Sequence, residues 1–254
     1  MNKILMGTIA LEVNRWGSRM PSYLVSEWIP KFRADGFDGI ELWENHVLLS
    51  EGEAEKIKAS GFPVGVYNTY AGFSDSDEDK AARAKAAEMI NFFGAGAVKY
   101  NVGNDYDLLE VYKENVLRFA ESLHKDCTLM CECHDGTVFE DNLLFREVFN
   151  ELCPEKFAIV MHPFVHPMEL ELNFDNLCPR IAHIHSQLSK DGKRVRLDRW
   201  PERVDACFKI MKKFGFAGGF TVEFTELTAE PGENIDDLYA NAVLDYKYIK
   251  EAFG

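Results

Sequence analysis

The sequence lacks an apolar run long enough to cross a bilayer. A transmembrane helix needs roughly 20 consecutive, mostly apolar residues, and no run in the 254 residues approaches this length. The amino-terminal stretch MNKILMGTIALEV has only a short apolar part, which Glu12 interrupts, and no small-residue cleavage site of a signal peptide follows it. We therefore expect no membrane partner, no export signal and a cytoplasmic location.

Cysteine pairs with the spacing of a zinc knuckle or a redox site are also missing. Such sites need two residues between the cysteines, whereas Cys131 and Cys133 are separated by only one. We interpret all six cysteines as free thiols that are mostly buried, a usage that suits a reducing compartment. They are Cys127, Cys131, Cys133, Cys153, Cys178 and Cys207.

Positive charge is scarce. The chain has 28 Lys and Arg against 42 Asp and Glu, which gives a formal net charge of -14. Because this charge repels polyanions, a nucleic-acid partner would require a strong local basic patch. The only basic cluster, KDGKRVRLDR at 190–199, is short and interleaved with acids, so we interpret it as solvated surface and expect no nucleic-acid partner.

Linkers and nucleotide-binding motifs are absent as well, and what fills the chain is a regular alternation of β-rich runs and amphipathic stretches. The strand candidates are 3–10, 39–43, 64–68, 97–102, 127–134, 157–162, 180–185 and 219–225. The helix candidates include 22–34, 81–93, 108–125, 139–152, 201–214 and 235–253. Eight β/α units predict an α/β fold, a single (β/α)8 TIM barrel spanning 1–254. The alternative is an open doubly wound sheet, but the first βα turn has no G-x-G-x-x-G fingerprint.

Ionisable side chains stand at the ends of the last four predicted strands. The segments are CECHD at 131–135, VMH at 160–162, HIH at 183–185 and TVEFTE at 221–226. Side chains alternate between the two faces of a strand, so an inward Glu132 places His134 inward too, and His183 and His185 share a face. On the last strand the same rule groups Glu223 with Thr221 and Thr225.

Buried carboxylates need a compensating cation or donor network. Imidazole and carboxylate ligands together suit Mn²⁺ or Zn²⁺ first, then Co²⁺ or Fe²⁺, whereas an all-oxygen shell would suit Mg²⁺. The alternative is that Glu132 and Glu223 are polar core residues held by Lys99 or an arginine. His183 lies one layer deeper, where a packed, hydrogen-bonded histidine is the expected role.

Four segments resemble strand signatures of the xylose isomerase-like superfamily of sugar isomerases and epimerases: GFDGIEL at 36–42, CECH at 131–134, IAHIH at 181–185 and GGFTVE at 218–223. The resemblance implies that Glu132, His162, His185 and Glu223 hold a divalent metal. His162 departs from the pattern of the resembled family, which has Asp at this position on strand six. The site therefore has one negative charge fewer than the family's site. If His162 is not a ligand, His166 or a water is expected to complete the shell.

The resemblance also implies the chemistry, which is isomerisation or epimerisation of a small sugar or hydroxy-ketone through an enediolate. Glu132 and Glu223 would then be the acid and base. A dehydratase or lyase could use the same chemistry, and a barrel that binds ligand without metal is the non-catalytic alternative. The resembled superfamily also includes an endonuclease that cleaves abasic DNA, and its metals are held by additional histidines on strands three and four. Here these strands end in Tyr67-Asn68 and Tyr100-Asn101, so endonuclease activity is disfavoured.

Further residues are candidates for substrate binding. Glu41 corresponds to the strand-two glutamate of the resembled family, although a salt bridge to Lys99 is an alternative role for it. Aromatic rings can pack against the C–H face of a sugar, and the guanidinium group of an arginine can bind a carboxylate or phosphate. The substrate-binding candidates are thus Glu41, Trp16, Tyr67, His134 and Arg194. Barrels of this kind often pair through their loops, so a homo-oligomer is a further expectation.

Overall fold

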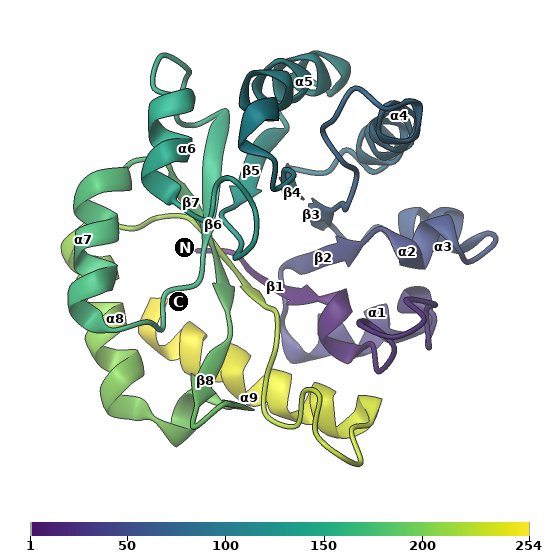
Figure 1. Ribbon diagram of the computed structural model, residues 1–254. Coiled ribbons are helices and arrows are strands. Elements are labelled where there is room, and N and C mark those ends of the chain that lie inside the picture. The colour runs from purple at the N-terminus through teal and green to yellow at the C-terminus, as the bar shows by residue number, and fades with distance from the viewer. Residues whose placement is uncertain (1, 254) are drawn as a thin grey trace.

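A computed structural model describes residues 2–253 of the chain. Eight parallel strands close into a barrel in the order β1-β10-β7-β6-β5-β4-β3-β2, seen in the centre of Figure 1. This confirms the predicted (β/α)8 barrel. The strands are β1 (Ile4–Gly7), β2 (Gly39–Trp43), β3 (Val64–Asn68), β4 (Ala97–Tyr100), β5 (Thr128–Glu132), β6 (Phe157–Met161), β7 (Ile181–Ser186) and β10 (Gly219–Val222).

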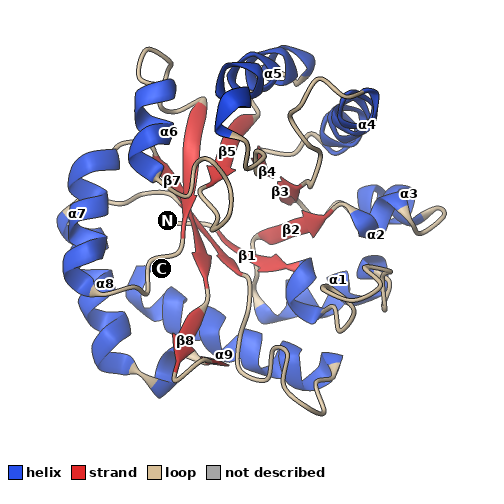
Figure 2. Cartoon of the chain, in the orientation of Figure 1, coloured by secondary structure: helices blue, strands red, loops and turns tan. Residues whose placement is uncertain are grey.

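Helices surround the barrel as an outer layer (Figure 2). They are α1 (Val25–Asp35), α2 (Asn45–Leu48), α3 (Glu53–Ala59), α4 (Asp77–Phe93), α5 (Leu109–Ser122), α6 (Asn142–Val148), α7 (Pro167–Leu177), α8 (Pro201–Lys213) and α9 (Ile235–Phe253). Short 3-10 helices occupy Thr8–Leu11, Tyr106–Leu108 and Leu197–Arg199. Within residues 2–253, no helix combines the length and the apolar character that crossing a membrane requires.

Glycines end two of the helices where the chain must turn back into the barrel. Gly36 after α1 and Gly94 after α4 have φ values of +94° and +64°, a left-handed conformation that costs glycine little. At its other end, α4 is capped by Ser76, whose side chain accepts a hydrogen bond from the backbone N–H of Asp79. Gly36 and Gly94 thus end α1 and α4 and turn the chain towards β2 and β4.

Alternation along the strands divides the core into two parts. Outward-facing side chains, including that of Cys131, pack against the helices in one large cluster. Inward-facing side chains form a small apolar cluster inside the barrel: Leu5, Val66, Ala97, Met130, Ala158 and Val160. Above this cluster, towards the carboxyl ends of the strands, the interior becomes polar.

Several predicted strands are longer than the observed ones. The expected strand 3–10 ends at Gly7, where Thr8–Leu11 turns into a 3-10 helix, and 127–134 ends at Glu132. Beyond these points the chain leaves the barrel wall to form the loops around the site. The segment expected to be a solvated loop also contains a two-stranded antiparallel sheet of β8 (Leu188–Lys190) and β9 (Lys193–Val195).

Candidate metal centre

Four side chains converge at the carboxyl-terminal end of the barrel. Glu132 ends β5, His185 lies on β7, and His162 and Glu223 directly follow β6 and β10. Each offers one ligand atom, and these atoms all lie within 4.8 Å of one another. The structure thus brings together the four residues that the resemblance implied, although they come from segments up to 91 residues apart.

The spacing of these atoms suits a common central ion. Nδ1 of His185 lies 3.0 Å from Oε1 of Glu223 and 3.4 Å from Oε1 of Glu132. Nε2 of His162 lies 3.4 Å from Oε1 of Glu132 and 3.3 Å from Oε2 of Glu223. Ligands about 2.1 Å from a tetrahedral ion are separated by about 3.4 Å, so the observed separations match such a shell.

Glu41 fixes the orientation of the His185 ring by contacting its Nε2 atom, on the side away from the metal-binding Nδ1. Nε2 of His185 lies 3.0 Å from Oε2 of Glu41, and the same carboxylate accepts hydrogen bonds from Asn68 (3.0 Å) and Thr221 (2.8 Å). Burial opposes ionisation of Glu41, but His185 more than compensates, so the pKa of Glu41 is lowered. An ionised Glu41 places a proton on Nε2 and leaves Nδ1 as the metal-binding atom, as in the carboxylate–histidine–metal arrangement.

Lys99, which stands on β4, is buried with only 2% of its surface exposed. Its Nζ lies 2.5 Å from Oε2 of Glu132 and 2.9 Å from Oδ1 of Asn101. Asn101 in turn donates to the backbone oxygen of Glu132 at 3.0 Å. Lys99 therefore binds Glu132, as one alternative from the sequence proposed, and not Glu41. The pairing occupies Oε2 and leaves Oε1 of Glu132 facing the two histidines.

The charges of the site balance when no ion is present. Burial disfavours a charged imidazole, yet hydrogen bonds to Glu132 and Glu223 raise the pKa of His162 to about 9. Burial likewise opposes charge on His185, but its pKa is raised because Glu223 and Glu41 face it. Two imidazolium groups and Lys99 thus offset three buried carboxylates. One divalent ion with two neutral imidazoles gives the same total.

The residues present fit a divalent metal. Nδ1 of His185 is buried and makes no well-aligned hydrogen bond among residues 2–253, although carboxylate oxygens of Glu223 and Glu132 lie 3.0 Å and 3.4 Å from it. An unpaired buried nitrogen is costly, and an ion bound between the four donors would satisfy it. Two imidazole nitrogens and two carboxylates are a donor set that Zn²⁺ and Mn²⁺ accept readily, whereas Mg²⁺ prefers oxygen alone.

A cavity of about 310 Å³ opens directly above the four donors. The indole ring of Trp16 lies 5.4 Å from the ring of Phe224 and forms one wall, and the guanidinium group of Arg194 lies 5.9 Å from the Phe224 ring. Three predicted substrate-binding residues therefore line this cavity: Trp16, His134 and Arg194. The other lining residues are Tyr70, Asn101, Glu132, Thr137, His162, Gln187, Glu223 and Phe224.

The remaining residues considered for the site from the sequence do not line this cavity. Tyr67 is fully buried in the outer core because its neighbours Val66 and Asn68 face inward, so it does not reach the cavity. Glu41 lies beneath His185 rather than on the cavity wall. His183 hydrogen bonds to Thr221 one layer deeper. His166 caps the first turn of α7 and is not among the four converging residues.

No family model and no curated protein matches the sequence, but solved structures match almost the whole chain. A probable 3-DHS dehydratase, AsbF from Bacillus anthracis, is 18% identical over 98% of this chain and 99% of its own, with a TM-score of 0.67. The D-psicose 3-epimerase of Clostridium cellulolyticum H10 is 11% identical over 99% of each chain, with a TM-score of 0.69. The IolI protein, whose crystal structure holds a zinc atom, is 13% identical over 99% of each chain, with a TM-score of 0.67.

These likenesses define the fold as that of the xylose isomerase-like TIM barrels. Sugar epimerases, isomerase-like proteins and a dehydratase are all among the similar structures. At such identities the likeness shows the fold alone.

Proposed function

We propose that this protein is a metal-dependent isomerase or epimerase of a small sugar or hydroxy-ketone. The observation that carries the proposal is the convergence of Glu132, His162, His185 and Glu223, with one buried histidine nitrogen left unpaired. The cavity above them is large enough for a small polyhydroxylated molecule. The epimerases of the same fold support this substrate class.

The ion proposed for the site is Zn²⁺ or Mn²⁺, with Co²⁺, Fe²⁺ and Mg²⁺ as the next candidates. Glu132 would hold it through Oε1, His185 through Nδ1, His162 through Nε2, and Glu223 through a carboxylate oxygen. When bound, a divalent ion supplies Lewis-acid polarisation of the substrate carbonyl and its neighbouring hydroxyl.

Glu132 and Glu223 are the candidates for proton transfer. Burial would raise the pKa of both, but Lys99 holds the pKa of Glu132 well below its usual range, and His185 lowers that of Glu223 to about 2. Both carboxylates are thus ionised and able to accept a proton from the carbon beside a carbonyl. After that step the protonated carboxyl can return a proton to the same or the neighbouring carbon.

The cavity wall would orient the substrate. Trp16 and Phe224 present aromatic surface to the C–H face of a sugar. Arg194 and His134 stand at the same cavity, where they can donate hydrogen bonds to hydroxyl, carboxylate or phosphate oxygens. Glu41 acts on the substrate only indirectly, because it holds the ring of His185.

Exchange of the α-proton in deuterated water tests the proposal. The metal-loaded protein is incubated with a panel of ketoses, and deuterium incorporation is followed by proton NMR. We expect exchange in the wild type and in the surface control Glu202→Gln. Loss of at least about 100-fold is expected in Glu132→Gln and Glu223→Gln. Exchange that persists in both of these variants would overturn the assignment.

A binding-only barrel is the second candidate, and the ion-free charge balance favours it. Because Lys99 and two imidazolium groups can neutralise the three carboxylates, the site can persist without metal.

A dehydratase would use the same carboxylates for proton abstraction, and it differs from an isomerase in releasing water and forming an unsaturated product. Product analysis by mass spectrometry separates these two reactions, while the absence of bound metal would favour the binding-only barrel.

A further inference from the structure

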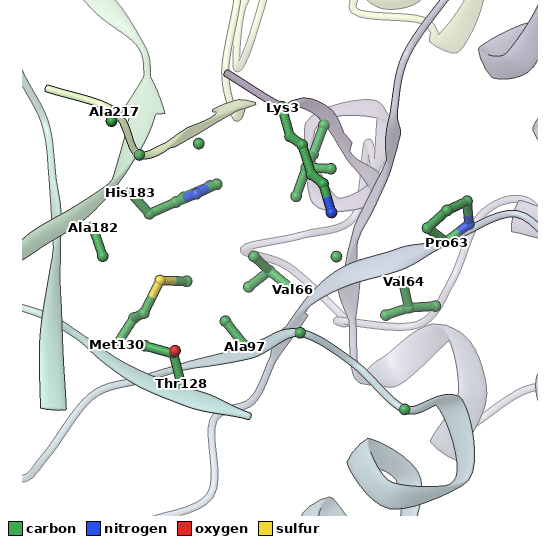
Figure 3. A pocket seen from close by; sticks show the side chains of 16 residues that line it. Lys3, Pro63, Val64, Val66, Ala97, Thr128, Met130, Ala182, His183 and Ala217 are labelled. Carbon is green, nitrogen blue, oxygen red and sulfur yellow. The ribbon is translucent and has the colours of Figure 1, made fainter. Parts of the chain in front are cut away.

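A second and larger cavity, of about 540 Å³, lies at the opposite, amino-terminal end of the barrel (Figure 3). In most TIM barrels layers of bulky side chains fill the interior. Here half of the lining residues are glycine or alanine, including Gly65, Gly96, Ala97, Ala182 and Gly219. No residue lines both this cavity and the one above the metal centre. The two are therefore distinct sites.

The cavity contains a buried imidazole with one nitrogen unused. His183 lines it and is only 4% exposed. Its Nε2 lies 2.7 Å from Oγ1 of Thr221, which donates its own proton to Glu41. The threonine oxygen must therefore accept from Nε2–H, so Nδ1 carries a lone pair. In the neutral ring Nδ1 has no hydrogen-bond partner among residues 2–253, and the imidazole borders the cavity.

The cavity also has an ammonium group, on the exposed residue Lys3. Lys3 lines the cavity, and Figure 3 shows its amino group directed into the space bordered by Val66 and Pro63. Within residues 2–253, no carboxylate forms an ion pair with it. Between Lys3 and His183 the walls are mainly apolar and include Leu5 and Met130. The cavity thus offers a cation, an apolar middle and a hydrogen-bond acceptor.

We propose that this amino-terminal cavity binds a small, mostly apolar hydroxy acid, with the carboxylate on Lys3 and the hydroxyl donating to Nδ1 of His183. A volume of this size is within the range of small-molecule sites, which combine apolar walls with a few placed polar groups. A hydrogen-bond acceptor at the wall of a mostly apolar cavity favours a ligand that supplies a donor.

Methionine-methyl NMR offers a direct test, since Met130 is 3% exposed and lines this cavity. The full-length protein, labelled with ¹³C at its methionine methyl groups, is titrated with 4-hydroxyphenylacetate and with 6-hydroxyhexanoate. The Met130 signal is assigned with Met130→Leu. We expect a saturable shift of that signal with at least one probe. For the aromatic probe, binding should weaken about tenfold when the hydroxyl or the carboxylate is removed, as in phenylacetate and 4-hydroxyphenethyl alcohol.

Two variants locate the site. Ala97→Leu fills the cavity and should abolish binding, and Lys3→Met should weaken it about tenfold, while the exposed control Lys209→Met leaves it unchanged. Melting temperatures verify that each variant is folded, and Zn²⁺ binding verifies that the opposite end of the barrel is intact. The proposal is overturned if neither probe shifts Met130 up to about 10 mM, a very weak affinity, or if folded Ala97→Leu binds as the wild type does.

Discussion

Glu41, Glu132 and Glu223 are three buried carboxylates at one end of a barrel, and their neutralisation explains most of the local structure. Lys99 supplies one positive charge permanently. The other two come either from His162 and His185 as imidazolium groups or from one divalent ion. Metal binding is therefore an exchange of two protons for one ion, without a change in total charge.

This exchange predicts how metal affinity depends on pH. The pKa of His162 is raised to about 9 and that of His185 is also raised, so both carry a proton at neutral pH that the metal must displace. Affinity should rise about 100-fold per pH unit between pH 6 and 8, and two protons should be released per ion. Calorimetric titration of Zn²⁺ in buffers of different ionisation enthalpy counts these protons. An affinity that is independent of pH would remove both histidines from the ligand set.

Lys99 has an effect on stability that depends on the metal. Lys99→Met leaves the carboxylate of Glu132 buried without its cation, and breaking a buried pair typically costs about 3–5 kcal/mol. We expect that loss in urea unfolding of the metal-free protein, and a smaller loss with saturating Zn²⁺. The double variant Lys99→Met/Glu132→Gln should recover much of the metal-free stability. Equal losses with and without Zn²⁺ would contradict a shared site.

Alternation in the sequence predicts which residues share a face with Glu132, His185 and Glu223, because it depends only on neighbours along one strand. Alternation does not predict which carboxylate Lys99 binds, because that depends on the register and tilt of the strands around the closed barrel. For the same reason it does not reveal that Glu41 on β2 reaches His185 on β7. The prediction that Tyr67 binds substrate does not match its position in the outer core, because alternation alone does not say which of the two faces of a strand points inward.

Among the elements, α9 is joined to the barrel by a buried carboxylate. Asp245 on this helix accepts hydrogen bonds from Oγ1 of Thr225 (2.6 Å) and from the backbone N–H of Leu197 (2.7 Å). Burial raises the pKa of Asp245 to about 7. The folded state therefore binds this proton more tightly than the unfolded state does.

The raised pKa predicts a loss of stability as the pH rises. Between the unfolded pKa near 4 and the folded pKa near 7, the contribution of Asp245 should decrease by a few kcal/mol, since each pKa unit is worth about 1.4 kcal/mol. Asp245→Asn should abolish this contribution while keeping one acceptor. Urea unfolding of both proteins from pH 4.5 to 7.5 gives the difference curve. A pH-independent difference between them would refute the assignment.

Local signals predict the barrel strands and most helices, but not where each strand ends. The ends depend on loops that bend away to carry residues such as Asn101 and His134 to the site. The β8–β9 hairpin had a usable signal in Asp191-Gly192, whose φ values are +53° and +78°. Asp-Gly is a favoured central pair of a two-residue hairpin turn, but the mostly polar and charged residues on either side obscure the signal.

At the scale of the whole molecule, β1 pairs with both β2 and β10, so the two ends of the chain close one barrel. This pairing supports the proposal that residues 1–254 form a single domain. The barrel presents two chemically different ends, with ionised ligands at the carboxyl end and a mostly apolar cavity at the other. Among the residues that line them, none is shared between the two cavities.

The metal content of the purified protein tests the central claim most directly. The protein is prepared without a polyhistidine tag and measured by plasma mass spectrometry, alongside His185→Ala and the surface control Glu202→Gln. The site described here predicts about one Zn²⁺ or Mn²⁺ per chain in the wild type and the control, and a large loss in His185→Ala. A wild-type content near zero, with no thermal shift on adding Mn²⁺, Co²⁺ or Zn²⁺, would contradict it.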